Sequence, residues 1–343
     1  MSFHVLWSCN AHFLYVSFMY FSSDRRQQCI PCVCFIPIKQ CEFSYLLTVG
    51  MYFVFSSSKQ LLFINPREGK YISCNPADLP SSSGITVTSD NNIYIVDARE
   101  LEHELQLSLF KYNHGKNLWE HECKSSVSKI QDNCYEEHLL EVDGILYYTA
   151  VDPEEDRPLL ELRKYNLQTK KWQECSHLQV SKTLYQSATL SCGSHIYFLT
   201  STEMHCYDPS EDSWCRRTPP MNITDVCTAV AMGTEIFCTD FDFTQTMVYD
   251  TESDSWQKLQ GWSNPRNLEM DFRPNFFLLE NQLHIFFGLT VKQGPSPDIF
   301  IYVYDRSADT WRDLNASLPD KTRYTHGCQF PVARMYLPYL NSA

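Results

Sequence analysis

A tyrosine followed seven residues later by a tryptophan recurs along the chain, and this spacing restricts the fold more than any other feature. In one copy, Tyr165 and Asn166 lead through a polar stretch to Trp172. Five copies share the step: Tyr112 to Trp119, Tyr165 to Trp172, Tyr207 to Trp214, Tyr249 to Trp256, and Tyr304 to Trp311. A degenerate sixth copy runs from Ile64 to Tyr71. The Asn or Asp after each tyrosine tolerates turn geometry, so each copy predicts a β-hairpin with the tryptophan in the return strand.

The tryptophans lie 53, 42, 42 and 55 residues apart, which is the range of repeats that contain four strands. Two more apolar segments precede each hairpin and are joined by a short polar turn, as in 186–190 and 193–199. Equivalent pairs surround Asn91, Gly144 and Asn281, and another covers 228–238. We therefore expect each unit to be a four-stranded antiparallel meander.

A single sheet of this kind leaves a face uncovered, so the units are expected to pack radially in a ring. The succession of an apolar strand, a Gly-x-Ile-Tyr strand, a Tyr-Asp turn and a tryptophan resembles the kelch repeat over about residues 51 to 340. The chain departs from that repeat at the end of the second strand, where a double glycine is usual. Thr149, Thr200 and Thr239 stand near that position.

Five complete units end at the five tryptophans, and both ends of the chain retain unused strands. The apolar run 327–332 and the segments 52–55 and 61–64 are each too short for a unit, but together they make a sixth. We predict an all-β, six-bladed kelch β-propeller with four-stranded antiparallel blades, over residues 51–343. Its last blade is closed by both termini, with the C-terminal strand innermost, which removes open sheet edges.

Residues 1–50 do not follow the repeat and are predicted to be a poorly ordered segment outside the propeller. A signal peptide would need a basic start and a small-residue cleavage site, which the segment does not have. A signal anchor over Phe3–Phe21 is the alternative, although polar residues interrupt that run. We expect no membrane partner. Cys29, Cys32, Cys34 and Cys41 do not have the second spaced pair typical of a zinc site, so no metal is predicted.

Composition and motifs argue against several classes of function. The formal net charge is -13 without a basic stripe, which predicts no nucleic-acid partner. The sequence contains no G-x-S-x-G, P-loop, G-x-G-x-x-G or H-E-x-x-H motif, so we expect neither an enzyme nor a cofactor. A copper oxidase, which some kelch propellers are, is the rival interpretation. The ten cysteines after residue 50 are interpreted as small buried hydrophobes in a reducing compartment, which indicates the cytoplasm, with the nucleus as an alternative.

A propeller without catalytic motifs is expected to act through its loops. The links from strand 2 to 3 and from strand 4 to the next blade emerge at the same end and are the longer ones here. They are predicted to carry an acidic arc of Glu100, Glu102, Glu104, Asp152, Glu154, Glu155 and Asp156. Across the ring, a basic arc would contain Arg266, Arg273, Lys292, Lys321 and Arg323. Trp262 and Tyr324 are candidate aromatic anchors for a peptide partner lying across the pore. The alternative is that these loops are charged only because they are exposed.

The resemblance is strongest to the propeller half of BTB-kelch proteins, also called kelch repeat and BTB domain-containing proteins. In that family the propeller captures a protein substrate, and a BTB and BACK pair dimerises and docks a cullin-RING ubiquitin ligase. This sequence shows no BTB or BACK pattern. The resemblance therefore implies a protein or peptide substrate, with a cullin reached only through the missing half. The alternative is a stand-alone kelch scaffold or decoy, cytoskeletal or regulatory, with no ubiquitin role.

Overall fold

The computed structural model describes the backbone of most of the chain, and it contains strands and turns but no helix within the described residues. The described residues are 5–10, 13–18, 32–37, 49–57, 60–65, 70–73, 84–101, 104–114, 116, 118–128, 136–151, 158–180, 187–220, 223–262, 269–290, 298–315, 331–336 and 341–342. Two compact units are present. One contains Met1–Val49 with Tyr336–Pro338, and the other contains Gly50–Met335 with Tyr339–Ala343.

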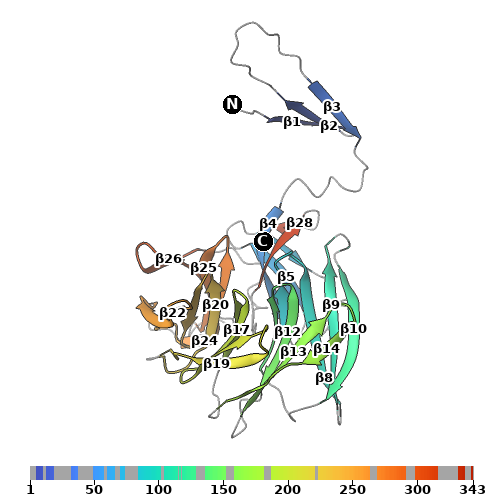
Figure 1. The fold of residues 1–343 in the computed structure, drawn as a ribbon. Coiled ribbons are helices and arrows are strands. Elements are labelled where there is room, and N and C mark those ends of the chain that lie inside the picture. The colour runs from blue at the N-terminus through green and yellow to red at the C-terminus, as the bar shows by residue number, and fades with distance from the viewer. Residues whose placement is uncertain are drawn as a thin grey trace, which may run out of the picture. The chain divides into compact units, whose positions relative to one another are not determined.

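The first unit holds a three-stranded antiparallel sheet in the order β1-β2-β3 (Figure 1). Its strands are β1 (Val5–Asn10), β2 (Phe13–Phe18) and β3 (Cys32–Pro37). The sequence predicts no regular element here, and the structure differs. The physical reason is composition: aromatic and β-branched residues favour strands even where polar and apolar residues do not alternate.

The second unit contains five four-stranded antiparallel meanders in chain order, with β15 added beside β13 (Figure 1). The first two are β7 (Gly84–Val87), β8 (Ile93–Glu100), β9 (Glu104–Asn113) and β10 (Leu118–Ser128), then β11 (Glu136–Val142), β12 (Ile145–Val151), β13 (Leu159–Asn166), β14 (Lys171–Glu174) and β15 (Leu178–Gln179). The next two are β16 (Ala188–Cys192), β17 (His195–Leu199), β18 (Met204–Asp208) and β19 (Ser213–Arg217), then β20 (Thr228–Met232), β21 (Glu235–Thr239), β22 (Thr246–Asp250) and β23 (Ser255–Leu259). The fifth is β24 (Glu269–Leu279), β25 (Gln282–Thr290), β26 (Asp298–Asp305) and β27 (Thr310–Asp313).

A further sheet joins both ends of the unit in the order β28-β4-β5-β6-β29. Its strands are β28 (Val332–Tyr336), β4 (Val49–Ser57), β5 (Gln60–Asn65), β6 (Lys70–Ser73) and β29 (Asn341–Ser342). The C-terminal strand therefore pairs with N-terminal strands, as predicted from the unused segments. It begins at Val332, where the predicted run ends, and residues 327–330 of that run lie outside the described part of the chain.

The Asn91 side chain and the backbone of β28 connect this last sheet to the first. The Asn91 Nδ2 donates to the Arg334 carbonyl at 2.9 Å, and the Arg334 amide donates to Asn91 Oδ1 at 2.7 Å. Phe63 and Ala333 pack in one buried cluster with residues of the first sheet, including Tyr112. The rings of Phe63 and Tyr112 lie 5.2 Å apart. The sheet formed by the two ends thus lies against the first sheet, in agreement with the predicted propeller of antiparallel sheets, of which four have four strands and two have five.

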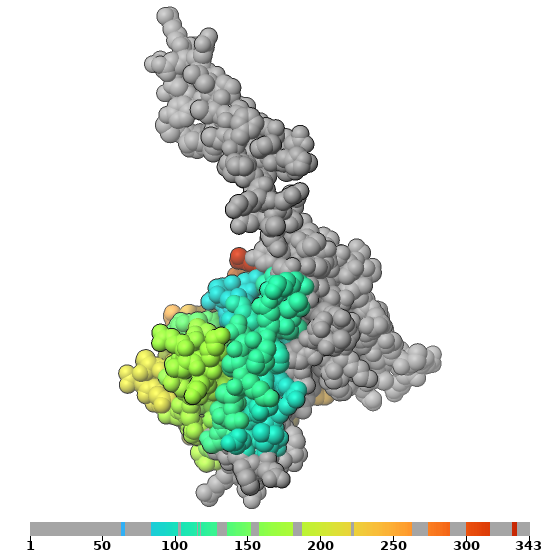
Figure 2. Space-filling view, turned by 90° about the vertical axis from the view of Figure 1, so that its right-hand side faces the viewer, coloured from blue at the N-terminus to red at the C-terminus, as the bar shows by residue number. Residues whose placement is uncertain are grey.

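Neighbouring sheets bury their apolar faces against each other. The surfaces of the β7–β10 and β11–β14 sheets lie side by side in Figure 2, in cyan to teal and in green. Between them Leu107 and Leu109 pack with Leu139 and Tyr148 in one buried cluster. Burial of each such side chain contributes about 1.5–3 kcal/mol. At Gly84 an added Cβ would lie 2.8 Å from the Leu139 amide nitrogen, so glycine permits the close approach of β7 and β11.

The recurrent tyrosines and tryptophans are direct cross-strand partners in the third and fourth strands of their sheets. Their ring centroids are 5.0 to 5.3 Å apart. The pairs are Tyr112 with Trp119, Tyr165 with Trp172, Tyr207 with Trp214, Tyr249 with Trp256, and Tyr304 with Trp311. Ile64 and Tyr71 of the degenerate copy are paired in the same way. The seven-residue step is therefore the number of residues that a hairpin needs to bring the tryptophan of its second strand opposite the tyrosine of its first.

Candidate functional site

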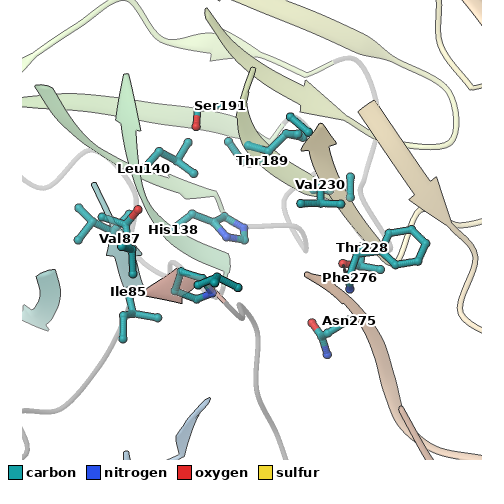
Figure 3. A pocket seen from close by; sticks show the side chains of 18 of the residues that line it. Ile85, Val87, His138, Leu140, Thr189, Ser191, Thr228, Val230, Asn275 and Phe276 are labelled. Carbon is teal, nitrogen blue, oxygen red and sulfur yellow. Dashed lines mark hydrogen bonds between the residues drawn. The ribbon is translucent and has the colours of Figure 1, made fainter. Parts of the chain in front are cut away.

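The innermost strands of all six sheets surround one cavity of about 330 Å³. Figure 3 shows labelled side chains from β7, β11, β16, β20 and β24 around it. Pro331 and Val332, at the start of β28, complete the lining. A ring of strands far apart in sequence thus shares one central cavity, the position in which a propeller has its axial channel.

Polar groups from three strands stand in or beside this cavity. Ser187 donates to the Glu136 carboxylate, and Thr228 Oγ1 accepts from the Phe276 amide at 3.2 Å. Burial of the His138 imidazole lowers its pKa from the usual value to about 4, so the ring is neutral at pH 7. Thr189 Oγ1 is buried without a hydrogen-bond partner within the described structure. The cavity lining therefore combines polar and apolar side chains, and His138 contributes no charge to it at pH 7.

The described part of the acidic arc lies at the tip of the first blade. Glu100 ends β8 and Glu104 begins β9, and both are exposed. The Leu101 amide donates to the Glu104 carbonyl at 2.8 Å, which closes the tip. Leu101 is 46% exposed between the two carboxylates. This leucine was not among the predicted site residues, because an apolar residue in a short link carries no signal of its exposure in the sequence.

Most other members of the two arcs lie outside the described residues. These are Glu102, Asp152, Glu154, Glu155, Asp156, Arg266, Lys292, Lys321, Arg323 and Tyr324. Their proposed arrangement into an acidic and a basic arc therefore stays a prediction.

Two predicted site residues are placed differently by the structure. Trp262 is only 7% exposed, and its ring lies 6.1 Å from Phe243 and 5.1 Å from Phe287. Its aromatic surface is packed between the fourth and fifth blades and is not offered to a partner. Arg273 was expected in the link before the fifth blade but lies within β24. The reason is that β24 starts early, at Glu269, and two register irregularities accommodate the extra length.

The structure also shows a contact between blades that sequence analysis missed, which we name the inter-blade clamp. In each clamp, the residue four positions after a repeat tryptophan forms two hydrogen bonds with the next blade. Its backbone amide donates to an aspartate side chain, and its backbone carbonyl accepts from the indole N–H of the next repeat tryptophan. The central residues of the three clamps are Ser176, Thr218 and Gln260. At Thr218 the amide donates to Asp254 Oδ1 at 3.0 Å, and the carbonyl accepts from Trp256 Nε1 at 2.7 Å.

The aspartate of each clamp stands five residues after the repeat tyrosine and also accepts from its hydroxyl. These bonds join Tyr207 to Asp212, Tyr249 to Asp254, and Tyr304 to Asp309, at 2.6 to 2.7 Å. The Ser176 amide is the main cause of the lowered pKa of Asp212, and the Tyr249 hydroxyl is the main cause for Asp254. The aspartates adopt positive φ angles of 47° to 50°, a conformation that Asp tolerates better than most residues. Aligning the five hairpins would have revealed this recurring aspartate.

No clamp joins the first blade to the second within the described residues. Lys170 occupies the aspartate position of the second blade, and the indole nitrogens of Trp119 and Trp172 are buried without partners in the described structure. Cys123, four residues after Trp119, is paired with Leu109 in the β10–β9 ladder, so its backbone is engaged within its own sheet. The described clamps therefore join the second blade to the third, the third to the fourth and the fourth to the fifth.

Across the described residues, no group of three or more His, Cys, Asp or Glu side chains could hold a metal ion. The described part of the chain also has no helix of the length and hydropathy needed to cross a membrane. His205 Nε2 lies 3.1 Å from Glu203 Oε2, and His195 lies 3.9 Å from Asp208, so each has one carboxylate neighbour.

No protein-family model matches the chain. Among curated proteins, Kelch repeat and BTB domain-containing protein 8 from Xenopus tropicalis is 25% identical over 160 residues, which are 43% of this chain and 25% of the relative. The similarity therefore extends over only a quarter of that relative's length. It is weak and local, but it agrees with the repeat pattern in the sequence.

Two solved structures align with most of the chain. A chain from the crystal structure of the nidogen/laminin complex aligns with a TM-score of 0.52 and 10% identity, covering 83% of this chain and 98% of its own. YjhT aligns with a TM-score of 0.46 and 10% identity, covering 78% of this chain and 98% of its own. At such identities the likeness of the nidogen/laminin chain concerns the fold alone. Together with the paired strands, it identifies a β-propeller with kelch-like sequence.

Proposed function

We propose that the protein is a protein-binding propeller that recognises substrates for a cullin-RING ubiquitin ligase, and that it acts by binding rather than by catalysis. The observation that carries this proposal is the local similarity to a kelch repeat and BTB domain-containing protein, in a chain whose inner strands surround one central cavity. We propose a cytoplasmic location for it. In this proposal a BTB and BACK pair binds the cullin, and of these two domains the name of the relative mentions BTB.

The exposed tip of the first blade is the described surface at which a partner is expected to bind. Glu100 and Glu104 are exposed on either side of Leu101. An exposed leucine between carboxylates suits a segment that combines apolar and basic residues. Charge pairs at such a rim mainly affect association rate and salt dependence, so affinity for this partner should fall as salt rises.

The test uses the full chain and a variant with Glu100→Lys and Glu104→Lys. Proteins captured from cells by the full chain are purified and their affinity is measured at low and high salt. A matched control is Glu252→Lys, an exposed carboxylate in the turn between β22 and β23, at the other end of the strands. A substrate at the proposed surface binds at least about tenfold more weakly to the double variant, with unchanged binding to the control variant.

The ubiquitin role is tested separately. The chain is joined to the part of the Xenopus tropicalis relative that contains its BTB domain, and ubiquitylation of a captured partner is measured with a purified cullin-RING ligase. Modification that requires the intact surface supports the proposal. A partner that binds but is not modified contradicts the ligase role and leaves a stand-alone scaffold. Equal binding by the wild-type and double-variant chains contradicts the proposed surface.

A further inference from the structure

Two cysteines face each other across neighbouring strands of the third blade. Cys206 of β18 and Cys215 of β19 are direct partners in the antiparallel register. Directly opposed residues lie on the same face of a sheet, with Cα atoms about 4.5 to 5.5 Å apart. A disulfide needs Cα atoms about 4.4 to 6.8 Å apart, so either type of antiparallel pair meets the requirement. The register thus places two free thiols where a cross-strand bond needs no rearrangement of the backbone.

The two thiols differ in access to solvent. Cys206 is 1% exposed within the cluster between the third and fourth blades, whereas Cys215 is exposed. Tyr197 is the partner of Cys206 on the inner side, so Tyr197, Cys206 and Cys215 form a row across three strands. A small oxidant can therefore reach the outer sulfur first, and the inner sulfur is shielded from it.

A positive charge stands beside both sulfurs. Arg217 follows Cys215 by two residues on the same face of β19 and is paired with Met204, diagonal to Cys206. Its guanidinium interacts electrostatically with both Cys215 and Cys206. A guanidinium stabilises a nearby thiolate, which is the nucleophilic form of cysteine. The pair therefore has an accessible thiol, a shielded second thiol and a neighbouring cation.

We propose that Cys206 and Cys215 are a redox modification site, at which a peroxide converts the two thiols into a reversible cross-strand disulfide. The Cys215 thiolate attacks one oxygen of the peroxide, the O–O bond breaks, and a sulfenic acid and hydroxide form. Cys206 then attacks the Cys215 sulfur, which forms the S–S bond and releases the sulfenic oxygen as water. The two electrons given up by the sulfurs reduce the peroxide.

The second step should depend on pH. Burial raises the pKa of Cys206 to about 11, so only a small part of this thiol is ionised at pH 7. Thiolate is the attacking species, and its fraction increases about tenfold per pH unit below the pKa. Conversion of the sulfenic acid to the disulfide is therefore expected to accelerate between pH 7 and pH 9.

The test treats the folded, reduced full chain with hydrogen peroxide and analyses its peptides by mass spectrometry. Combined cleavage after acidic residues Glu203 and Glu211 and basic residue Arg216 puts Cys206 and Cys215 on two separate peptides. The expected product is a disulfide-linked pair of these peptides that disappears after treatment with dithiothreitol. Cys215→Ser should abolish it, and Cys227→Ser, a matched change at another partly accessible cysteine, should leave it at the wild-type level.

A second measurement examines the role of the cation. Arg217→Gln should slow sulfenic acid formation at Cys215 by at least about threefold, and Arg217→Lys should restore part of the rate. The proposal is wrong if peroxide carries Cys215 to the sulfinic acid without producing the linked peptides. It is equally wrong if Cys206 links to Cys192 or Cys227 as abundantly as to Cys215. Cys215 is exposed, so its serine variant is expected to fold and loss of the product cannot be ascribed to unfolding.

Discussion

At the scale of single residues, the inter-blade clamp shows how two side chains of one blade bond both backbone groups of a residue in the preceding blade. Asp254 accepts from the Tyr249 hydroxyl of its own hairpin and from the Thr218 amide of the preceding blade. The Trp256 indole bonds the carbonyl of the same Thr218. Both backbone groups of Thr218 thus find partners in the next blade, which fixes the spacing between two sheets with no strand pairing between them.

We predict that Asp254→Ala lowers the free energy of unfolding by about 1–2 kcal/mol, because it removes two hydrogen bonds to a charged acceptor at a partly exposed site. Glu252→Ala, in the same turn and exposed, should change it by less than about 0.5 kcal/mol. Urea denaturation of both variants measures the difference. Equal effects would show that the clamp does not stabilise the fold.

His138 predicts a pH dependence at the same scale. Its folded-state pKa of about 4 lies below the usual value of 6.5, so the unfolded chain binds more protons between these pH values. Stability is therefore fully present above pH 6.5 and is lost as the pH falls toward 4. The loss attributable to this histidine is about 1–3 kcal/mol.

Melting curves between pH 4 and pH 7 test this prediction. His138→Gln should flatten the dependence of the melting temperature on pH, and His121→Gln, an exposed histidine of β10, should leave it as in the wild type. An unchanged slope in His138→Gln would show that the ring is accessible to protons in the folded state.

At the scale of elements, β28 is the strand on which ring closure depends. It pairs with β4 in the last sheet, and its Arg334 backbone bonds twice to Asn91 of the first blade. Asn91 has a positive φ of 65°, which an asparagine tolerates better than most residues. The short strand β28 is thus bonded both to β4 of the last sheet and to Asn91 of the first blade.

We predict that Asn91→Gly, which permits the positive φ but removes both bonds, increases hydrogen exchange in β28 by about tenfold or more. The amides of β16 to β19 should exchange as in the wild type, because they belong to another sheet. Mass spectrometry of exchanged peptides resolves the two regions. Uniformly faster exchange would mean that Asn91 supports the whole ring rather than its closing strand.

At the scale of the whole molecule, the propeller unit contains its own six sheets and the cores between them. Contacts group Gly50–Met335 apart from Met1–Val49. We predict that a shortened chain without residues 1–48 melts within about 3 °C of the full chain. Removing 332–343 should instead abolish the cooperative transition, because β4 loses its inner partner. Calorimetry distinguishes these results, and a large drop after the first deletion would show that the propeller depends on the N-terminal unit.

The sequence was most informative where one feature repeats. The seven-residue step located all five hairpins, because the step is set by the register that places Tyr165 opposite Trp172. The closing sheet followed from unused strands, and its strand β28 starts at Val332, the last residue of the predicted run. The site was predicted less well. Exposure of Leu101 and burial of Trp262 depend on how a link folds back, and residue type alone does not determine either.

The pairing of β28 with β4 also has a consequence for synthesis. The two strands are separated by nearly the whole propeller in the sequence, so the ring stays open until residue 336 has left the ribosome. During that time β4 presents an unpaired edge that can recruit strands of other chains. Contacts this distant in sequence also make folding slow. The nascent protein should therefore depend on chaperones longest at its earliest propeller strand, and a chain that stops before Val332 would leave that strand without its partner.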